Sequence, residues 1–153
     1  MPKDIKVKRI KNGTVIDHIT SGQALNVLRI LGITEEYPKA PVSVAMNVPS
    51  RKLGTKDIVK IEGRELESDE VGRITLISPD ATINIVRDKE IVEKRKVRLP
   101  ETIEGVLRCA NPNCISNSES AKTRFRIEDK KPIKIRCFYC ERVMYEPDIV
   151  TQF

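Results

Sequence analysis

The chain has 153 residues, of which 39% are hydrophobic and 33% charged, and its formal net charge is +6. This length suits one domain or two small ones, and the composition is that of a globular chain. No apolar run approaches the roughly 18 residues of a membrane-spanning helix, and no apolar stretch follows the charged N-terminus as in a signal peptide. We therefore expect a cytoplasmic protein without a membrane partner, whose charge is mostly a solvated surface of mixed acids and bases.

Strand patterns dominate the first hundred residues. Apolar and polar side chains alternate, with the period of two typical of strands, over residues 4–10, 41–48, 56–62, 81–88 and 90–99. Residues 14–19 are a short β-branched stretch that predicts an extended segment or a bend.

Two helices are predicted between these strands. The first begins after Ser21 as its cap, and its apolar face consists of Leu25, Leu28 and Leu31. The second begins after Ser68, and its apolar face consists of Val71, Ile74 and Ile77. The element order is β-α-β-β-α-β with one extra strand, which is the ferredoxin-like pattern.

A second domain is predicted after Leu99-Pro100, so the chain divides into residues 1–98 and 99–153. Residues 100–107 predict a short helix or turn. Residues 123–128 and 132–137 predict a hairpin, to which residues 142–146 add a third strand. The expected fold is α+β: a ferredoxin-like domain followed by a small all-β zinc-ribbon, or rubredoxin-like, domain.

All four cysteines lie in this second part. Four residues separate Cys109 from Cys114, two separate Cys137 from Cys140, and 22 lie between the pairs. Two close pairs on separate turns favour one structural zinc ion held by four thiolates, a site with no open position for a catalytic water. Rubredoxin-like iron and two disulfides are the alternatives, although thiols stay reduced in the cytoplasm.

No catalytic set stands out among the other residues. His18 is the only histidine, and a lone histidine is more often structural than catalytic. Five polar residues fall on or near predicted strands and together would bind a polyphosphate if one sheet face gathered them: His18, Lys56, Lys60, Asn84 and Lys94. The alternative is that the lysines are ordinary solvated side chains.

Five stretches of the sequence form a recognisable set: GTVIDHI (13–19), GTKDIVKIE (54–62), ATIN (81–84), LPETIEGVLRCANPNCIS (99–116) and CFYCE (137–141). In these stretches the chain shows a resemblance to the regulatory chain of aspartate carbamoyltransferase. It covers nearly the whole chain, in order and with similar spacing. The first motif and the NPNCIS…CxYCE frame are specific, whereas many zinc ribbons share the four cysteines alone.

The resemblance implies a non-catalytic chain of pyrimidine biosynthesis. In the family, the N-terminal domain binds nucleotide effectors, with CTP generally inhibiting and ATP generally activating. The zinc domain docks on the catalytic chain, and homodimers of the regulatory chain link catalytic trimers. Physically, an effector of this kind must interact differently with two quaternary states.

The resemblance also implies roles for individual residues. Ile10 would meet the base, Asp17 would lie near the ribose, and Lys60 would reach the ribose and the base edge. His18 and Lys94 would hold phosphates, and the rest of the pocket would be Lys56, Asn84, Val86 and Ile91. The catalytic chain would be contacted by Asn111, Asn113, Glu141 and Arg142, although the asparagines also suit a turn.

Two positions depart from the well-known bacterial form. Lys89 stands where that form has a tyrosine, and Asp4 replaces a lysine that helps to hold a second, metal-linked nucleotide. The main rival interpretation is a nucleic-acid-binding zinc-ribbon protein, in which the basic charge and Phe125, Phe138 and Tyr139 would contact phosphates and bases. A metalloenzyme would need an open metal position or a histidine ligand, and the four-cysteine frame provides neither.

Overall fold

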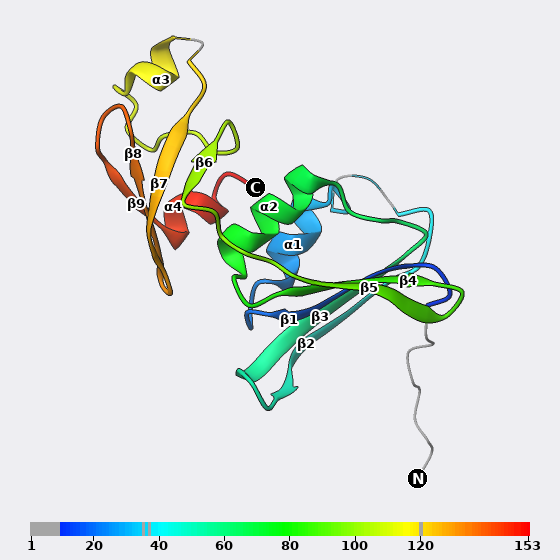
Figure 1. The fold of residues 1–153 in the computed structure, drawn as a ribbon. Coiled ribbons are helices and arrows are strands. Elements are labelled where there is room, and N and C mark those ends of the chain that lie inside the picture. The colour runs from blue at the N-terminus through cyan, green and yellow to red at the C-terminus, as the bar shows by residue number, and fades with distance from the viewer. Residues whose placement is uncertain (1–9, 35, 37, 120) are drawn as a thin grey trace.

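A computed structural model describes residues 10–34, 36, 38–119 and 121–153. The predicted strand at residues 4–10, and Asp4 with it, lies outside the described residues except for Ile10. Two antiparallel sheets, one of five strands and one of four, form the two parts of the molecule in Figure 1.

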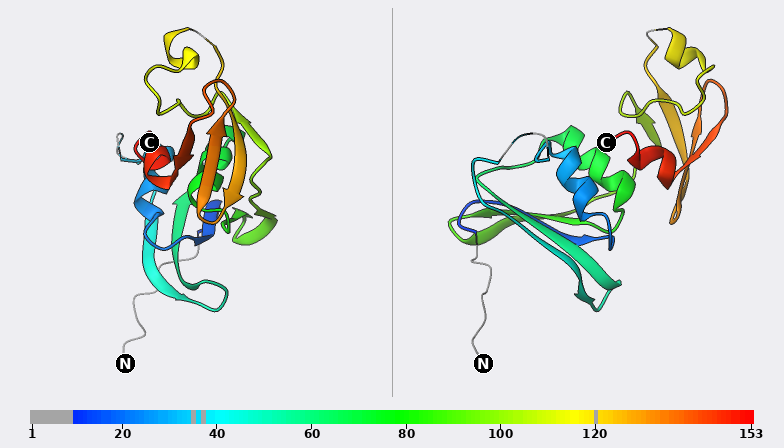
Figure 2. Two further views of the ribbon diagram at one scale, coloured as in Figure 1. Left: turned by 90° about the vertical axis from the view of Figure 1, so that its left-hand side faces the viewer. Right: turned by 180° about the vertical axis from the view of Figure 1, so that it is seen from behind.

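The larger sheet has the strand order β2-β3-β1-β4-β5. Its strands and the two helices that connect them are β1 (Gly13–Ile19), α1 (Ala24–Ile30), β2 (Val42–Ser50), β3 (Gly54–Glu62), α2 (Ser68–Ile77), β4 (Thr82–Arg87) and β5 (Glu90–Lys96). Every pair of neighbouring strands is antiparallel. This confirms the ferredoxin-like pattern, with residues 13–19 as its first strand and β5 as the extra one. Both helices cover the same face of the sheet, as Figure 2 shows, and the opposite face is open.

The first helix differs from the prediction in its cap and in its buried face. Gln23, not Ser21, is the N-cap residue, and the buried side chains of the helix are Ala24, Val27 and Ile30. Of the predicted face, Leu31 is buried, Leu28 is partly buried and Leu25 is 52% exposed. The N–H groups at the helix start are bound by the fully buried Asp57 carboxylate, which accepts from Gly22 and Ala24 at 2.9 and 3.1 Å. A side chain from β3 therefore fixes the start of α1, which a purely local pattern does not reveal.

The second helix is capped by Glu67 rather than by Ser68. Glu67 and Glu70 form a reciprocal capping box, in which the Glu67 N–H donates to Glu70 Oε1 at 3.0 Å. Ile74 and Ile77 are buried as predicted, and Val71 is partly buried.

The smaller sheet has the strand order β6-β7-β8-β9. Its elements are β6 (Thr102–Glu104), α3 (Ile115–Ser118), β7 (Arg124–Lys130), β8 (Ile133–Cys137), β9 (Val143–Tyr145) and α4 (Glu146–Val150). The predicted hairpin and third strand are confirmed. The helix or turn predicted at residues 100–107 is wrong in part, because residues 102–104 pair with β7 as a strand. Pairing with a distant segment decides this stretch, not its local preference.

One hydrophobic cluster extends through both parts of the chain. Leu76 and Ile77 of α2 belong to it, and so do Ile133, Ile135 and Ile149 of the C-terminal part. Helix α4 lies beside α2 (Figure 1), and Gln23 Nε2 donates to Glu146 Oε1 at 2.8 Å. Within the described chain, no helix is long and apolar enough to cross a membrane.

Candidate functional site

A cavity of about 540 Å³ lies on the open face of the larger sheet. Its lining residues come from every strand of the larger sheet except β2, from the turn before β5 and from the segment before β1: Ile10, Val15, Asp17, Ile58, Lys60, Asn84, Val86, Lys89, Glu90 and Ile91. Six of the nine predicted pocket residues therefore meet here. The other three, His18, Lys56 and Lys94, do not line the cavity but lie next to residues that do. His18 follows Asp17 in the chain, Lys56 pairs with Asp17, and Lys94 is opposite Asn84.

Strand register explains why these residues converge. Val15 of β1 is opposite Asn84 of β4 and Lys60 of β3, so the three side chains share one sheet face. Lys94 of β5 is opposite Asn84 and therefore belongs to the same face. This register places strands from both ends of the domain side by side, and it cannot be predicted from the spacing of residues along the chain.

An ion pair lies next to the cavity. Lys56 Nζ is 2.9 Å from Asp17 Oδ1, and the two side chains are only 17% and 27% exposed. Burial acts to raise the pKa of Asp17, but the hydrogen bonds from Lys56 and from the backbone N–H of His18 outweigh it, so the pKa lies below its ordinary value. Asp17 is thus ionised at neutral pH and holds Lys56 in place.

His18 is held in an unusual backbone conformation at the edge of this site. Its φ is +56°, in the left-handed region, at a point where the pairing of β1 with β3 shifts register. Its Nδ1 is 3.3 Å from Thr82 Oγ1 and 4.0 Å from Asp17 Oδ1. Left-handed backbone in a residue other than glycine persists where the surroundings enforce it, and such residues cluster at functional sites.

Asn84 carries the clearest sign that the cavity is built for a ligand. It is 6% exposed, and its Oδ1 has no hydrogen-bond partner among the described protein atoms. A buried polar atom without a partner is costly, so its position in the wall of a cavity points to a ligand N–H or O–H as the partner.

The residue predictions missed part of the cavity wall. Val15, Ile58 and Glu90 line it, and Lys96 lies opposite Thr82 on the same sheet face as Lys94. The alternation along β1 and β3 was a usable signal for Val15 and Ile58, because it places them on the same side as Asp17 and Lys60. Lys89, the position that departs from the bacterial form, also lines the cavity.

The four cysteines form one cluster in the C-terminal part. All four Sγ atoms lie within 4.8 Å of one another, and Cys109, Cys114 and Cys137 are buried. The separations are 3.5 Å for Cys109–Cys140 and 3.7 Å for Cys114–Cys137, far longer than the roughly 2 Å of a disulfide. A tetrahedral metal with bonds of about 2.3 Å to sulfur holds its ligands about 3.8 Å apart. The arrangement therefore fits zinc.

Burial and hydrogen bonds act in opposite directions on the thiols of the cluster. Burial raises the pKa of Cys109 to about 12. Burial acts the same way on Cys140, but hydrogen bonds from the Arg142 backbone and the Asn111 side chain lower its pKa to about 7. Amide donors aimed at sulfur atoms stabilise the charged ligands that a metal requires.

The four predicted docking residues lie on the two loops that carry the cysteines. Asn113, Glu141 and Arg142 are exposed and Asn111 is half-buried. The Asn113 N–H donates to Asn111 Oδ1 at 3.0 Å, so Asn111 does shape the turn as the alternative interpretation holds. Because the sulfur cluster brings the loops together, the four residues belong to one end of the domain.

Comparison with known proteins agrees with the fold and with a metal-binding C-terminal part. The family models described as aspartate carbamoyltransferase regulatory chain, allosteric domain, and metal binding domain match residues 5–98 and 101–150. The regulatory chain of Pyrococcus horikoshii is 53% identical over 148 residues, which are 97% of each chain. That of Methanothermobacter thermautotrophicus is 56% identical over 153 residues, 99% of this chain and 97% of the relative. The chain belongs to the family of aspartate carbamoyltransferase regulatory chains.

Proposed function

We propose that this chain is a non-catalytic regulatory subunit of a cytoplasmic aspartate carbamoyltransferase and that the cavity on its open sheet face binds CTP and ATP. The observation that carries the proposal is the cavity itself: about 540 Å³, with Lys60 and the unpaired Asn84 Oδ1 in its wall. This volume is within the usual range for small-molecule sites. The domain that binds the effector is residues 1–98.

The cavity has separate regions for the parts of a nucleotide. Ile10, Val86 and Ile91 give it an apolar part for the base. Asp17 and Lys60 are suited to the ribose hydroxyls, as an acceptor and a donor. Lys94 and Lys56 supply ammonium groups for the phosphates, and His18 supplies a ring nitrogen as a hydrogen-bond donor.

Phosphate binding at this site would release Lys56 from its present partner. Asp17 and Lys56 pair with each other at 2.9 Å, and a triphosphate carries more negative charge than one carboxylate. A bound nucleotide therefore competes with Asp17 for Lys56, so that binding rearranges the end of β1 as well as filling the cavity.

Residues 99–153 form the domain that docks on the catalytic chain. A single zinc ion bound by Cys109, Cys114, Cys137 and Cys140 stiffens two loops. These loops present four residues in a nearly fixed conformation, so binding costs little conformational entropy: Asn111, Asn113, Glu141 and Arg142. The ion is structural, because four protein thiolates leave it no open position.

A second copy of the chain is proposed to cover the outer edge of β2. This strand is at the end of the sheet order, and Val44 and Met46 are 39% and 46% exposed on it. An unpaired edge with apolar side chains is a ready surface for another strand. Homodimers formed there would link catalytic trimers through their two docking domains.

Calorimetric titration of the zinc-loaded chain with CTP tests the proposal, with single-stranded DNA as a parallel titrant. We expect saturable CTP binding that His18→Ala and Lys94→Ala weaken, each by about tenfold or more, since each removes a charge-assisted contact. Arg73→Ala, on helix α2 at the covered face of the sheet, is the matched control and should bind CTP like the parent.

The same experiment decides between a regulatory subunit and a nucleic-acid-binding ribbon. Salt-sensitive DNA binding without CTP binding would favour the ribbon. The structure disfavours base stacking on Phe138, because the guanidinium groups of Arg124 and Arg126 lie over this ring at 4.5 and 5.6 Å. Only one aromatic side chain in that loop, Tyr139, would then remain for a base.

A further inference from the structure

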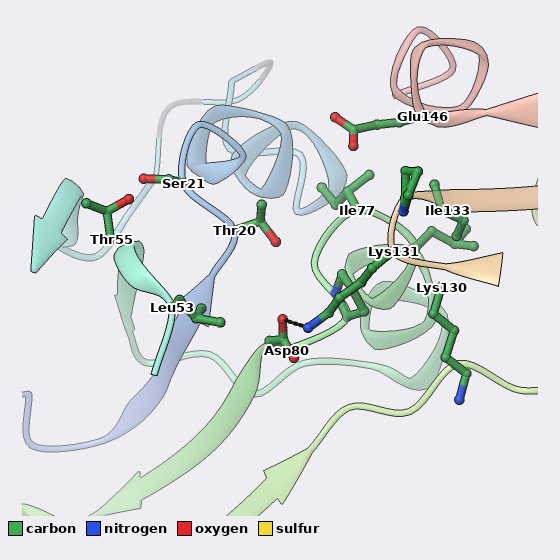
Figure 3. Close-up of a pocket in the computed structure, with 13 residues that line it drawn as sticks. Thr20, Ser21, Leu53, Thr55, Ile77, Asp80, Lys130, Lys131, Ile133 and Glu146 are labelled. Carbon is green, nitrogen blue, oxygen red and sulfur yellow. Dashed lines mark ion pairs between the residues drawn. The ribbon is translucent and has the colours of Figure 1, made fainter. Parts of the chain in front are cut away.

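A second cavity, of about 300 Å³, lies where the N-terminal and C-terminal parts of the chain meet. Figure 3 shows its two sides. Thr20, Ser21 and Leu53 line it from the N-terminal part, and Lys130, Lys131 and Ile133 from the β7–β8 hairpin. The hairpin tip therefore reaches out of the C-terminal sheet and lies against the N-terminal domain.

An ion pair joins the two sides of this cleft. Lys131, in the turn of the β7–β8 hairpin, pairs with Asp80, which follows helix α2, as the dashed line in Figure 3 marks. Asp80 is 19% exposed and Lys131 is 60% exposed. It is the only ion pair between the two parts of the chain among the described residues; the other charged contact is the hydrogen bond from Gln23 to Glu146.

On one side, Asp80 is connected to the proposed phosphate end of the nucleotide pocket. The Thr20 N–H, two residues after His18, donates to Ser78 Oγ at 2.9 Å. His18 Nδ1 is 3.3 Å from Thr82 Oγ1. Asp80 lies between Ser78 and Thr82 in the chain. A shift of His18 therefore acts on both ends of segment 78–82, which carries Asp80.

On the other side, Lys131 is connected to the metal-bound loops. Strand β8 begins two residues after Lys131, at Ile133, and ends at the metal ligand Cys137. Ile133 and Ile135 are 4% and 0% exposed, so the strand is fixed in the core of its domain. A strand packed in this way moves as a unit, and a displacement at the hairpin tip reaches the loop that carries Cys137 and Cys140.

We propose that Asp80 and Lys131 are positioning residues that set the orientation of the metal-binding domain relative to the nucleotide pocket, and that they carry part of the effector signal between them. This inference rests on the proposed function, since it takes the pocket as the input and the metal-bound loops as the output. A bound triphosphate at His18 displaces residues 78–82, the Asp80–Lys131 distance changes, and the hairpin with its strand reorients the docking loops.

An ion pair suits this task better than the apolar contacts around it. Its energy depends on the separation of two charges and on their screening by salt, whereas packed apolar surfaces resist small shifts. The pair is also exposed on the side of Lys131, so its strength is modest and it is made or lost without unfolding either domain.

The test uses the full chain assembled with its catalytic chain. The variants are Lys131→Gln, Asp80→Asn and the charge exchange Asp80→Lys with Lys131→Asp. The control is Glu65→Gln, which removes the exposed Arg87–Glu65 pair, 2.6 Å long, within the N-terminal part. The measurement is the factor by which saturating CTP changes the aspartate concentration needed for half-maximal rate.

Each single variant should reduce that factor by about two- to five-fold, the effect of losing one exposed ion pair. Their CTP affinity should stay within about two-fold of the parent chain, because neither residue lines the nucleotide pocket. The charge exchange should restore the response, and Glu65→Gln should leave it unchanged. Raising the salt concentration should reduce the response of the parent and have little effect on Lys131→Gln. An undiminished response in both single variants at low salt overturns the proposal.

A second readout separates this inference from the proposed function. NMR residual dipolar couplings of the isolated zinc-loaded chain report the orientation of its two domains relative to each other. Lys131→Gln should change that orientation, and Glu65→Gln should not. If the parent chain binds no CTP, the proposed function fails while this readout still decides the positioning role; an unchanged orientation in Lys131→Gln contradicts that role whether or not CTP binds.

Discussion

Asn84 provides a sharp test of whether the cavity on the open sheet face evolved to hold a ligand. Its Oδ1 is buried and has no hydrogen-bond partner among the residues that the structure describes, and its Nδ2 makes one long bond of 3.4 Å to the Val15 carbonyl. An unpaired buried polar atom costs about 1–3 kcal/mol, and an ordinary hydrogen bond contributes only about 1 kcal/mol. Asn84→Leu, which keeps the branching at Cγ, should therefore raise the free energy of unfolding by about 1 kcal/mol.

The same substitution should weaken nucleotide binding. If Asn84 Oδ1 accepts a hydrogen bond from the ligand, its loss leaves a ligand donor unpaired and costs about 1–3 kcal/mol, or roughly 5- to 150-fold in the dissociation constant. Stability and affinity should thus change in opposite directions, which a simple packing defect does not produce.

Thr14→Val is the matched control on the neighbouring strand. Thr14 is fully buried, and its Oγ1 donates to the Arg64 carbonyl at 2.6 Å. Because this hydroxyl has its partner, the nearly isosteric valine should lower the free energy of unfolding by about 1–3 kcal/mol. Urea unfolding of the zinc-loaded chain and calorimetric titration with CTP measure both effects. The reasoning is refuted if Asn84→Leu destabilises the chain as Thr14→Val does and binds CTP like the parent.

Three further predictions concern the other features of the chain. Chelating the zinc, or Cys114→Ser, should release the chain from the catalytic trimers, as sedimentation would show; an intact assembly after verified metal loss would contradict the docking role. The pKa of Asp17 is lowered from 3.8, so its contribution to stability is complete above about pH 4 and is lost as the pH falls through the folded-state pKa. Lys56→Met should raise the folded-state pKa of Asp17 toward its ordinary value and so make the acid-dependent loss of stability smaller in acid unfolding curves, and an unchanged curve would exclude the pairing. Met46→Lys should place a charge on the exposed edge of β2 and shift the isolated chain from dimer to monomer in light scattering, whereas a persistent dimer would locate the interface elsewhere.

The sequence predicted the order of elements well because their patterns are local. Alternation predicted β2 to β5 of the larger sheet, whereas its central strand β1 was predicted only as an extended segment or a bend. The two cysteine pairs predicted a cluster that the structure confirms. Residues 102–104 were mistaken for a helix or turn because their strand exists only through pairing with β7. Leu25 was placed in the core because leucines at helical spacing suggest a buried face, yet the start of α1 is set by Asp57 from another strand.

The proposed nucleotide pocket could not be predicted from composition and spacing alone. Asn84 and Lys60 meet because each is opposite Val15 across a different strand pair. That register cannot be read from the order of the residues in the sequence. Resemblance to a family supplied the residues that local patterns left scattered, and six of the nine line the cavity. What resemblance did not supply was the unpaired state of Asn84 or the contact of Lys131 with Asp80, which depend on the geometry of this chain.

The left-handed backbone positions have a consequence for protein engineering. Of the described residues other than glycine, five have a positive φ: His18, Asn47, Asp88, Lys89 and Glu141. A designer who wanted a more heat-resistant protein would try glycine at such positions, because glycine adopts this backbone without steric penalty. In this chain, glycine at His18 would remove the imidazole beside the cavity on the open sheet face, and glycine at Lys89 would remove a side chain of the cavity wall. Glycine at Glu141 would remove a carboxylate of the loop proposed to dock on the catalytic chain. At these positions, a substitution that stabilises the fold would also remove a side chain needed for the proposed regulation. Substitutions meant to stabilise the chain and keep its regulatory response must therefore be made at other positions.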